Sequence, residues 1–372
     1  MFRHTIPLGR ILGITIDVDY SWFLVFGLFT WMLATGYYPS EYKDWSKPQY
    51  WLMGAITAIM LFVSVLLHEL GHSAIALHYK LAVRRITLFV FGGVSQIVAE
   101  PPSAGAEFWI AAAGPLVSFL LALIFWELRP LLVGSEPLFA LAKYLAAINL
   151  ILGLFNLVPG FPLDGGRIFR AIVWGVNHNF QRATSIAAVT GRFFGFLFIV
   201  AGVWQVFAGQ LLNGVWIAFI GWFLESAATS QLQQQMIKGL LVGHKVSEIM
   251  DHNYERIPGD ITLGELVDKH VLTAGQRSFV VNQGSGPVGL ITLSDIKKTP
   301  RSDWPTTIAR QVAVPEEKLV SIRPDAELWT ALEKMGRDGV NQLPVIDNNA
   351  VVGMLSRDDV LHYLQTLHAL HT

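Results

Sequence analysis

The 372-residue sequence contains no cysteine. Disulfide bonds and thiolate metal ligands are therefore excluded, and a bound zinc ion would have to be held by histidine and carboxylate side chains. Charge is also scarce: 15% of the residues are charged and 52% are hydrophobic, which departs from the composition of soluble domains. The net charge of −1 lacks the basic excess typical of nucleic-acid-binding proteins, so we expect no nucleic-acid partner.

The apolar residues are concentrated before about residue 235, in uncharged stretches long enough to cross a lipid bilayer. The N-terminal stretch is followed by Asp17 and Asp19 and has no small-residue cleavage site, so we expect no removable signal peptide. Six transmembrane spans are predicted. They lie at 20–40, 50–67, 108–126 and 144–163, with two more within about 183–224 that are separated by a turn near Gly209-Gln210 and Asn213-Gly214.

The second predicted span runs into the sequence LLHELGHS, residues 66–73. His68 and His72 are four positions apart, so on a helix both imidazoles lie on one face and can bind one ion. Glu69 is adjacent, within reach of a water held by that ion. This is the spacing of zinc metalloproteases, in which the metal acidifies a water and the glutamate takes its proton. So short a pattern also occurs by chance, but three ionisable groups inside an apolar span are costly, which favours a functional metal site.

A third metal ligand must come from another part of the chain. Asp164 stands between a proline-rich stretch and two glycines in NLVPGFPLDGGR, residues 156–167. Aspartate is also a favoured N-cap, so Asp164 is alternatively the cap of a helix predicted over 165–176. Because the site needs a third ligand and no cysteine is available, Asp164 is the preferred candidate.

Other ionisable side chains compete for the role of third ligand or lie inside the spans. Glu100 and Glu107 follow His72 at a distance where soluble zinc proteases often place a third carboxylate, but their proline-rich turn before the third span predicts solvated side chains. His78 falls on a different face of the helix from His72 and is expected to be a surface or core histidine. Arg192, in the fifth span, is expected to snorkel or to pair internally.

HELGH on one span and N-x-x-P-x-x-P-L-D-G-G on a later one, at 156–166, together resemble the site-2 protease family of intramembrane zinc metalloproteases. The resemblance covers the whole membrane half. It implies one zinc ion per chain with His68, His72 and Asp164 as ligands and Glu69 as general base. It also implies a substrate-binding role near Asn156, as an oxyanion donor.

The resemblance extends to Ala-Gly-Pro at 113–115 in the third span. Ser118, however, stands where many members of the family have asparagine. The polar role of that position is therefore not carried over to this sequence.

Two stretches of the membrane half have strand patterns. Residues 14–20 alternate between apolar and polar, and 83–99 is rich in β-branched and aromatic residues on both sides of Gly92-Gly93, which predicts a hairpin. Because an exposed strand edge can pair with an extended peptide, we hypothesise that this hairpin, with the first strand, holds an unwound substrate. A plain connecting hairpin is the alternative.

The distribution of basic residues predicts the orientation in the membrane. Ten basic residues lie on the side of the N-terminus, namely Arg3, Arg10, Lys80, Arg84, Arg85, Arg167, Arg170, Arg182, Lys238 and Lys245. The opposite loops contain four, namely Lys43, Lys47, Arg129 and Lys143. We therefore expect a multi-pass protein of the bacterial plasma membrane with both termini in the cytoplasm and the zinc site near the cytoplasmic face.

From about residue 231 the composition changes through a glutamine-rich linker to a half with mixed αβ patterning. This half contains an internal repeat: VGLITLSDI from Val288 and VGMLSRDDV from Val352 are sixty-four residues apart. Each copy follows a strand-like run, FVV at 279–281 and LPVI at 343–346. The repeat resembles a tandem pair of CBS domains, which pack face to face around an adenosine-nucleotide cleft.

The CBS resemblance implies that Asp295 and Asp359 contact ribose hydroxyls and that Thr292 and Ser356 contact a phosphate of ATP, ADP or AMP. The alternative is that the pair binds nothing and only dimerises, because serine and threonine before a helix also act as caps. A homodimer formed through the CBS domains is expected.

The predicted fold is thus a polytopic α-helical membrane protein, with six transmembrane helices and a short β-hairpin and strand element, plus a soluble α/β tandem CBS module. Its domains are predicted at 1–230 for the transmembrane zinc metalloprotease domain, 231–243 for a linker, 244–300 for the first CBS domain and 301–372 for the second.

Two functions are consistent with these patterns. The first is an intramembrane zinc metalloprotease that cleaves the transmembrane segment of a single-span membrane protein in the lipid bilayer, a step of regulated intramembrane proteolysis modulated by the CBS pair. The second is an ion transporter or channel gated by the CBS domains. Glu69 discriminates between them, because transport does not need a glutamate beside two histidines.

Overall fold

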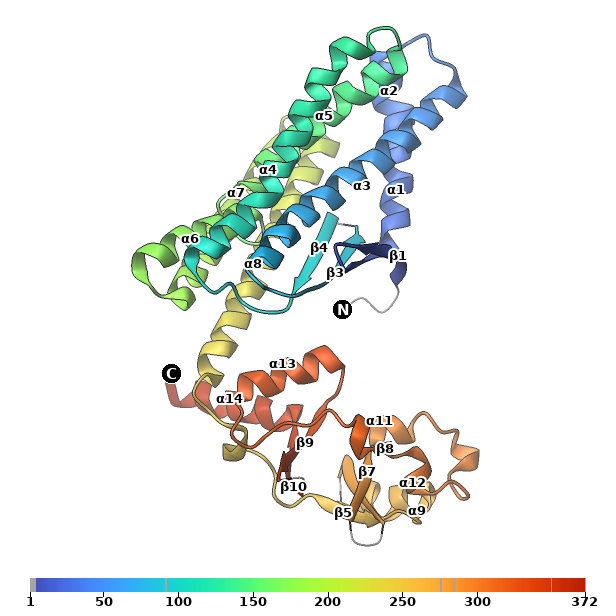
Figure 1. Cartoon of the computed structure of the whole chain (residues 1–372), viewed down its shortest axis with the longest axis vertical. Helices are drawn as coiled ribbons and strands as arrows, with labels where there is room; N and C mark the ends of the chain where they lie inside the picture. Colours follow the sequence, from blue (N-terminus) through green and yellow to red (C-terminus); the bar gives the residue numbers. More distant parts are fainter. Residues whose placement is uncertain (1–4, 91, 275, 284–285, 349, 372) are drawn as a thin grey trace. The chain divides into compact units, whose positions relative to one another are not determined.

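The structure is a computed structural model and describes residues 5–90, 92–274, 276–283, 286–348 and 350–371. The chain divides into two compact units, residues 1–235 and 236–372, and the division falls inside the predicted linker. Figure 1 shows the elements of each unit. Residues 231–241 of that linker are helical and belong to α8 (Leu211–Leu241). The domain boundaries inferred from composition stay predictions.

Long apolar helices build the first unit. Five helices in the described part of the chain are long and apolar enough to cross a membrane, which confirms the polytopic architecture. They are α3 (Lys47–His78), α4 (Ala104–Leu128), α5 (Glu136–Asn156), α7 (Phe180–Phe207) and α8. A short 3₁₀ turn, η2 (Arg129–Leu132), follows α4, and the amphipathic α6 (Asp164–Asn177) lies between α5 and α7.

The first predicted span, 20–40, forms three consecutive helical segments. They are α1 (Ser21–Met32), the π-helical η1 (Leu33–Tyr37) and α2 (Tyr38–Glu41). A π-helical turn is wider than an α-helical one and interrupts the regular hydrogen-bond ladder. Five spans are therefore confirmed within the described residues, and the predicted count of six is not.

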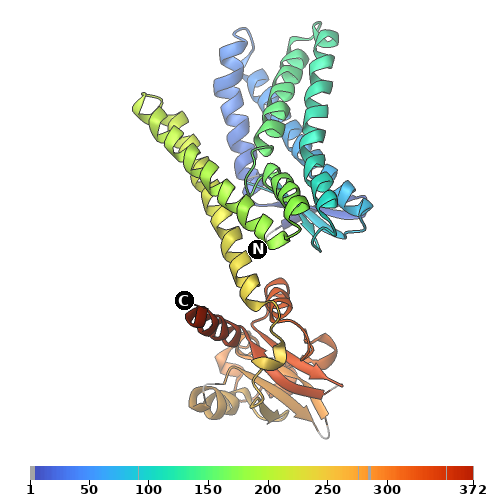
Figure 2. The same cartoon turned by 90° about the vertical axis from the view of Figure 1, so that its left-hand side faces the viewer.

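Several span boundaries differ from those predicted by hydropathy. The uncharged run of the second span ends at residue 67, and the helix continues through HELGH to His78, so the HELGH sequence lies on α3 as predicted. α5 ends at Asn156, because the prolines of the following stretch cannot continue the helix, although the uncharged run itself extends to 163. α7 and α8 are joined by a short turn at Gly209, which has φ +85°, whereas Gly214 lies within α8. Figure 2 shows α7 and α8 running side by side in opposite directions.

A four-stranded sheet lies beside α3 in Figure 1. Its strands are β1 (Thr5–Ile11), β2 (Ile14–Asp19), β3 (Val83–Phe89) and β4 (Gly92–Ile97), in the order β1-β2-β3-β4. β2 and β3 are parallel, and the other two pairs are antiparallel. The predicted strand and hairpin are thus present, but β1 was not predicted. Gly92 and Gly93 begin β4 instead of forming the turn. Phe91 lies outside the described residues.

One face of this sheet packs on the helices. Ile14, Ile16 and Ile86 form a buried cluster with Ile110 of α4 and Ala76 of α3. Alternate strand positions point to the same face, so this cluster fixes which side of β3 and β4 faces α3. The sheet is therefore held against the helix that carries HELGH.

The second unit contains two repeats in which a hairpin is followed by a helix, and the predicted repeat motifs lie on the second strand of each hairpin. The first has the sheet β5-β6-β7-β8, made of β5 (Glu255–Pro258), β6 (Ser278–Gln283), β7 (Gly286–Thr292) and β8 (Val314–Pro315). The second has β9 (Gln342–Asp347) and β10 (Ala350–Ser356) with α13 (Leu328–Asp338) and α14 (Arg357–His371). Short helical segments complete the unit, namely η3 (Val246–Glu248), α9 (Leu263–Leu266), η4 (Val267–Val271), α10 (Leu272–Ala274), α11 (Leu293–Ile296), η5 (Arg301–Asp303), α12 (Ala309–Val312) and η6 (Glu316–Lys318).

Candidate metal centre

Three predicted ligands converge between α3 and α6. Asp164 Oδ2 lies 3.0 Å from His68 Nε2 and 3.2 Å from His72 Nε2. The two Nε2 atoms are 3.1 Å apart. Both histidines are buried, with 4% and 3% of their surfaces exposed. The structure therefore brings together two imidazole nitrogens and a carboxylate oxygen from helices distant in sequence.

The other nitrogen of each imidazole is bonded to α4. His72 Nδ1 lies 2.7 Å from the carbonyl oxygen of Ile110, and His68 Nδ1 lies 2.9 Å from Ser118 Oγ. A carbonyl oxygen only accepts, so His72 Nδ1 carries the proton and its Nε2 keeps a lone pair for a metal. Ser118 has the polar role that the sequence left undecided.

Gly114 makes room for the imidazoles on the side of α4. A Cβ atom at this position would lie 2.2 Å from His72 Nε2 and 2.5 Å from His68 Nε2. Any side chain here would fill the space toward which the ligand atoms point. The glycine therefore leaves space beside the Nε2 atoms of both histidines.

This donor set fits a zinc ion. Two neutral imidazoles and one carboxylate are a usual protein ligand set of catalytic zinc sites, which keep a further position open. Electron pairs of three acceptor atoms that close together repel one another, and a divalent cation between them removes that repulsion. Ligand atoms of His68, Glu69 and His72 also lie within 4.8 Å of one another, so the candidate base is beside the site.

Asp164 is placed by the start of α6. The helix begins at Asp164, and Leu163 occupies the N-cap position without a side-chain cap bond. The carboxylate points to the two histidines, so the alternative role of Asp164 as a cap is wrong. The partial positive charge of the helix N-terminus additionally favours a carboxylate in the first turn.

Glu107 is buried, which makes the prediction of a solvated side chain wrong. It is 0% exposed and pairs with Arg170 of α6. The Arg170 guanidinium also lies over two aromatic rings, 5.0 Å from the centre of Phe161 and 4.6 Å from that of Phe180. This pair was not predicted, because the proline-rich turn before α4 looks solvent-exposed in the sequence. Arg170, a cation among apolar residues, was the available signal.

The other singled-out residues have different surroundings. Asn156 Nδ2 donates to Leu152 O at 3.0 Å, within its own helix, so in this structure the amide is bonded to the backbone. Glu100 and His78 are exposed. Arg192 pairs with Glu225 at 3.2 Å, as the prediction of an internal pair requires.

Glu69 contacts the edge strand of the sheet. Its side chain is half-buried, and its Oε2 accepts a hydrogen bond from Ser95 Oγ of β4 at 2.5 Å. Sequence reasoning did not identify Ser95, because nothing in the strand pattern distinguishes one serine from another.

The predicted nucleotide residues cap helices in the second unit. Asp295 Oδ2 accepts hydrogen bonds from Thr292 N and Oγ1, and Asp359 Oδ2 accepts one from Ser356 N. Partial burial opposes ionisation of Asp295, but hydrogen bonds from Lys298 and Thr292 lower the pKa of its carboxyl below the usual value. Capping is therefore present whether or not a ligand binds.

A cavity of about 790 Å³ lies between the two repeats. Thr292, Asp295 and Ser356 line it, whereas Asp359 is not among its lining residues. The cavity is bordered by more basic than acidic side chains, namely Arg277, Lys297, Lys298, Lys318 and Arg357 against Asp295, Asp338 and Asp358. This balance suits an anionic ligand.

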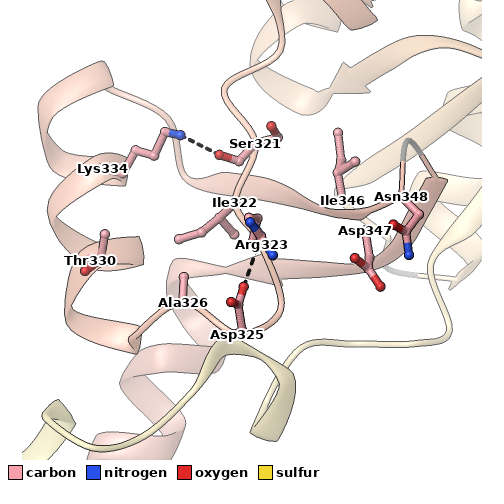
Figure 3. Close-up of a pocket in the computed structure, with 10 residues that line it drawn as sticks. All are labelled: Ser321, Ile322, Arg323, Asp325, Ala326, Thr330, Lys334, Ile346, Asp347 and Asn348. Carbon is pink, nitrogen blue, oxygen red and sulfur yellow. Dashed lines mark hydrogen bonds and ion pairs between the residues drawn. The ribbon is translucent and has the colours of Figure 1, made fainter.

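A second pocket, of about 770 Å³, is formed by the second repeat alone (Figure 3). Its lining contains two cations: Lys334 Nζ donates to Ser321 O at 2.5 Å, and Arg323 pairs with Asp325 at 3.2 Å. Asp347 adds a further negative charge to the lining. The pocket is therefore less suited to an anion than the cavity between the repeats.

A HExxH helix, a buried carboxylate against its imidazoles and a set of membrane-spanning helices define a membrane-embedded metallopeptidase. The chain belongs to peptidase family M50, the site-2 proteases. It is a multi-pass intramembrane metalloprotease that carries a CBS pair.

Comparisons with known proteins support this assignment. The profile of peptidase family M50 matches residues 56–136 and 131–200, and that of the CBS domain matches 246–301 and 309–366. Rip3 of Mycobacterium tuberculosis, which is named as a zinc metalloprotease, is 36% identical over 96% of this chain and 92% of its own length. A Synechocystis protein with the same type of name is 32% identical over 98% and 96%. The structure of a site-2 protease from Methanocaldococcus jannaschii is 28% identical over 62% of this chain and 95% of that chain, with a TM-score of 0.44.

Proposed function

We propose that the chain hydrolyses a peptide bond within the transmembrane segment of a membrane-protein substrate, with one Zn²⁺ held by His68, His72 and Asp164 and with Glu69 as general base. The observation that carries the proposal is the convergence of the three donor atoms within 3.2 Å in a buried site among apolar helices. When bound, Zn²⁺ supplies Lewis-acid chemistry that acidifies a water and polarises the substrate carbonyl.

The residues of the chain supply proton transfer and orientation. Glu69 accepts a proton from the attacking water and delivers it to the leaving amine. The carbonyl of Ile110 holds the His72 imidazole in the tautomer that leaves Nε2 free. Burial of both imidazoles excludes bulk water, which strengthens electrostatic interactions at the site.

Substitution of Glu69 tests the protease against a CBS-gated transporter or channel. We expect Glu69→Gln to retain zinc but to stop cleavage of a co-expressed single-span substrate, because only the base is removed. Asp164→Ala removes a ligand, so its zinc affinity should fall by more than the roughly tenfold to hundredfold typical of an outer-shell partner. Zinc content is measured by mass spectrometry and cleavage by immunoblotting. Cleavage by Glu69→Gln at the parent rate would contradict the proposed protease mechanism.

For the substrate, we propose an unwound segment paired with the edge of β4. In the sheet order β1-β2-β3-β4, the outer edge of β4 has no partner strand among the described residues. An extended peptide added there would gain main-chain hydrogen bonds beside Glu69. Proline removes one backbone donor per substitution, so a proline scan of 86–97 should abolish cleavage at several positions while zinc is retained. If cleavage stayed intact at every position, the hairpin would be a plain connection that does not bind substrate.

We also propose that the Asn156 amide donates to the substrate oxyanion. Its Nδ2 now bonds to Leu152 O, so the side chain must rotate for this role. Asn156→Asp should then lower kcat more than Asn156→Gln, because a carboxylate cannot donate to an anion. Equal kcat values for the parent and Asn156→Asp would show that Asn156 does not donate to the oxyanion.

We propose that the cavity between the CBS repeats binds an adenine nucleotide and that CBS pairs join two chains. The basic lining of the cavity supports an anionic ligand. ATP, ADP or AMP at about 100 times its Kd should stabilise the full-length protein by about 2.7 kcal/mol. Lys298→Ala, at the cavity, should weaken this effect, and Lys269→Ala, outside it, should not. Absence of a thermal shift at millimolar nucleotide would favour a pair that only dimerises.

A further inference from the structure

A hydrogen bond joins the proposed base to the edge strand. Ser95 Oγ, in β4, donates to Glu69 Oε2, in α3, at 2.5 Å, between residues that are 26 positions apart. An ionised acceptor makes such a bond short and roughly twice as strong as a bond between neutral groups. Oε1 of the same carboxylate accepts no hydrogen bond within the part of the chain that the structure describes.

The backbone of β4 also lies against the stem of Glu69. A Cβ atom added to Gly93 would lie 2.5 Å from Glu69 Cγ and 3.2 Å from Cδ. Gly93 and Ser95 are alternate residues of one strand and so point to the same face. Val94, between them, points to the opposite face and is 38% exposed. The strand therefore touches Glu69 at two successive inward positions.

We propose that Ser95 is a positioning residue that holds Glu69 and couples the engagement of substrate on β4 to the orientation of the base. This inference rests on the proposed function. A free glutamate side chain rotates about three bonds, whereas proton transfer needs one oxygen within hydrogen-bond reach of the water. The Ser95 bond holds Oε2, and the close approach of Gly93 restricts the stem, so the carboxylate is held in one orientation beside the two histidines. A strand that pairs with β4 stiffens the element that makes both contacts.

The test compares Ser95→Ala with Ser95→Thr, which keeps the hydroxyl. Ser230→Ala is a matched control, because it deletes an exposed hydroxyl bonded within its own helix, to Ser226 O at 2.9 Å. Three readouts are needed: kcat and KM for a purified membrane substrate, zinc per chain, and capture of uncleaved substrate by each variant combined with Glu69→Gln.

We expect Ser95→Ala to lower kcat by about tenfold to hundredfold, the scale of a misplaced catalytic group. KM, zinc content and substrate capture should stay within twofold of the parent. Ser95→Thr should recover most of the lost kcat, and Ser230→Ala should equal the parent.

Other results would overturn the inference. Parent kcat in Ser95→Ala would show that the bond does not position the base, and loss of zinc would indicate a structural role. A raised KM with weakened capture and unchanged kcat would mean that Ser95 contacts substrate directly, and so would not act through Glu69. Failure of Ser95→Thr to recover kcat would also count against it. Cleavage by Glu69→Gln alone would instead refute the proposed function, so the two failures are distinguishable.

Discussion

At the scale of single residues, α4 holds the Nδ1 atoms of the two imidazoles, on the side of each ring away from Nε2. The carbonyl of Ile110 and the hydroxyl of Ser118 bond to the two Nδ1 atoms, and both α4 residues are 0% exposed. Partners of this kind set the tautomer and ring orientation of a metal-binding histidine. The backbone carbonyl cannot be removed by substitution, but the Ser118 hydroxyl can.

Ser118→Ala should weaken zinc binding by about tenfold, because His68 loses the partner that orients its ring. Ser118→Asn keeps a polar side chain beside the imidazole and should lose less. Zinc affinity is measured by competition with a chelator at fixed pH. Equal affinities of Ser118→Ala and the parent would show that the packing of α3 orients the ring without this bond.

The Asp295 carboxyl predicts a pH dependence in the CBS unit. Its pKa is lower in the folded state than in the unfolded chain, so the ionised form stabilises the fold. That contribution is present above the unfolded pKa and is lost as the pH falls through the lowered folded value. The unfolding temperature of the parent should therefore drop more steeply than that of Asp295→Asn between about pH 5 and pH 2. If the unfolding temperatures of the parent and Asp295→Asn fell equally with pH, the lowered pKa of Asp295 would be contradicted.

At the scale of elements, the position of α6 depends on a buried ion pair. Arg170 reaches from α6 to Glu107 of α4 and lies over the rings of Phe161 and Phe180. A Thr184 hydroxyl of α7 lies 3.5 Å from the guanidinium. Because Asp164 is the first residue of α6, the same contacts that hold this helix also set the distance from its carboxylate to the histidines.

Arg170→Met should destabilise the protein by about 3–5 kcal/mol, because it leaves the Glu107 carboxylate buried without a counter-charge. Glu107→Leu combined with Arg170→Met should be less destabilising than Arg170→Met alone, since neither charge is then left unpaired. Thermal unfolding in detergent measures both. A double variant that is as unstable as the sum of the two single variants would argue against a direct ion pair.

Local sequence patterns predicted the elements that depend on local spacing. His68, Glu69 and His72 follow from helical periodicity, and the strands at 83–89 and 92–97 follow from β-branched composition. β1 was missed because it contains Pro7 and Gly9, which are depleted in strands, and because it buries no regular face. The Glu107–Arg170 and Ser95–Glu69 contacts were missed because tertiary packing, not spacing, brings their partners together.

At the scale of the whole molecule, the ends of the spans carry different polar groups. Lys143 pairs with Glu41 at 2.6 Å, and Trp45 donates to Glu136 at 2.7 Å. The end of the first predicted span thus contacts Lys143, which the basic-residue distribution assigns to the outer side. We propose that both termini and the CBS unit are cytoplasmic and that residues 21–41 form a sixth span, which puts the two ends of the membrane unit on one side.

The cysteine-free sequence makes this topology directly testable, because every introduced thiol is unique. Lys43 and Arg84 are both exposed and lie on opposite sides in the proposed topology. A membrane-impermeant maleimide applied to intact cells should label Lys43→Cys and should label Arg84→Cys only after permeabilisation. The reverse pattern would invert the orientation, and labelling of both in intact cells would exclude six spans in the proposed arrangement.

The two histidines and Asp164 are separated by about ninety positions of chain, 92 from His72. During biosynthesis, the ribosome has therefore to release α4, α5 and the start of α6 before the proposed zinc ligands can meet. A nascent or truncated chain that ends before residue 164 has the HELGH helix but lacks the carboxylate. If these three residues are the ligands, the proposed zinc site cannot be complete before α3, α4 and α5 have all been made.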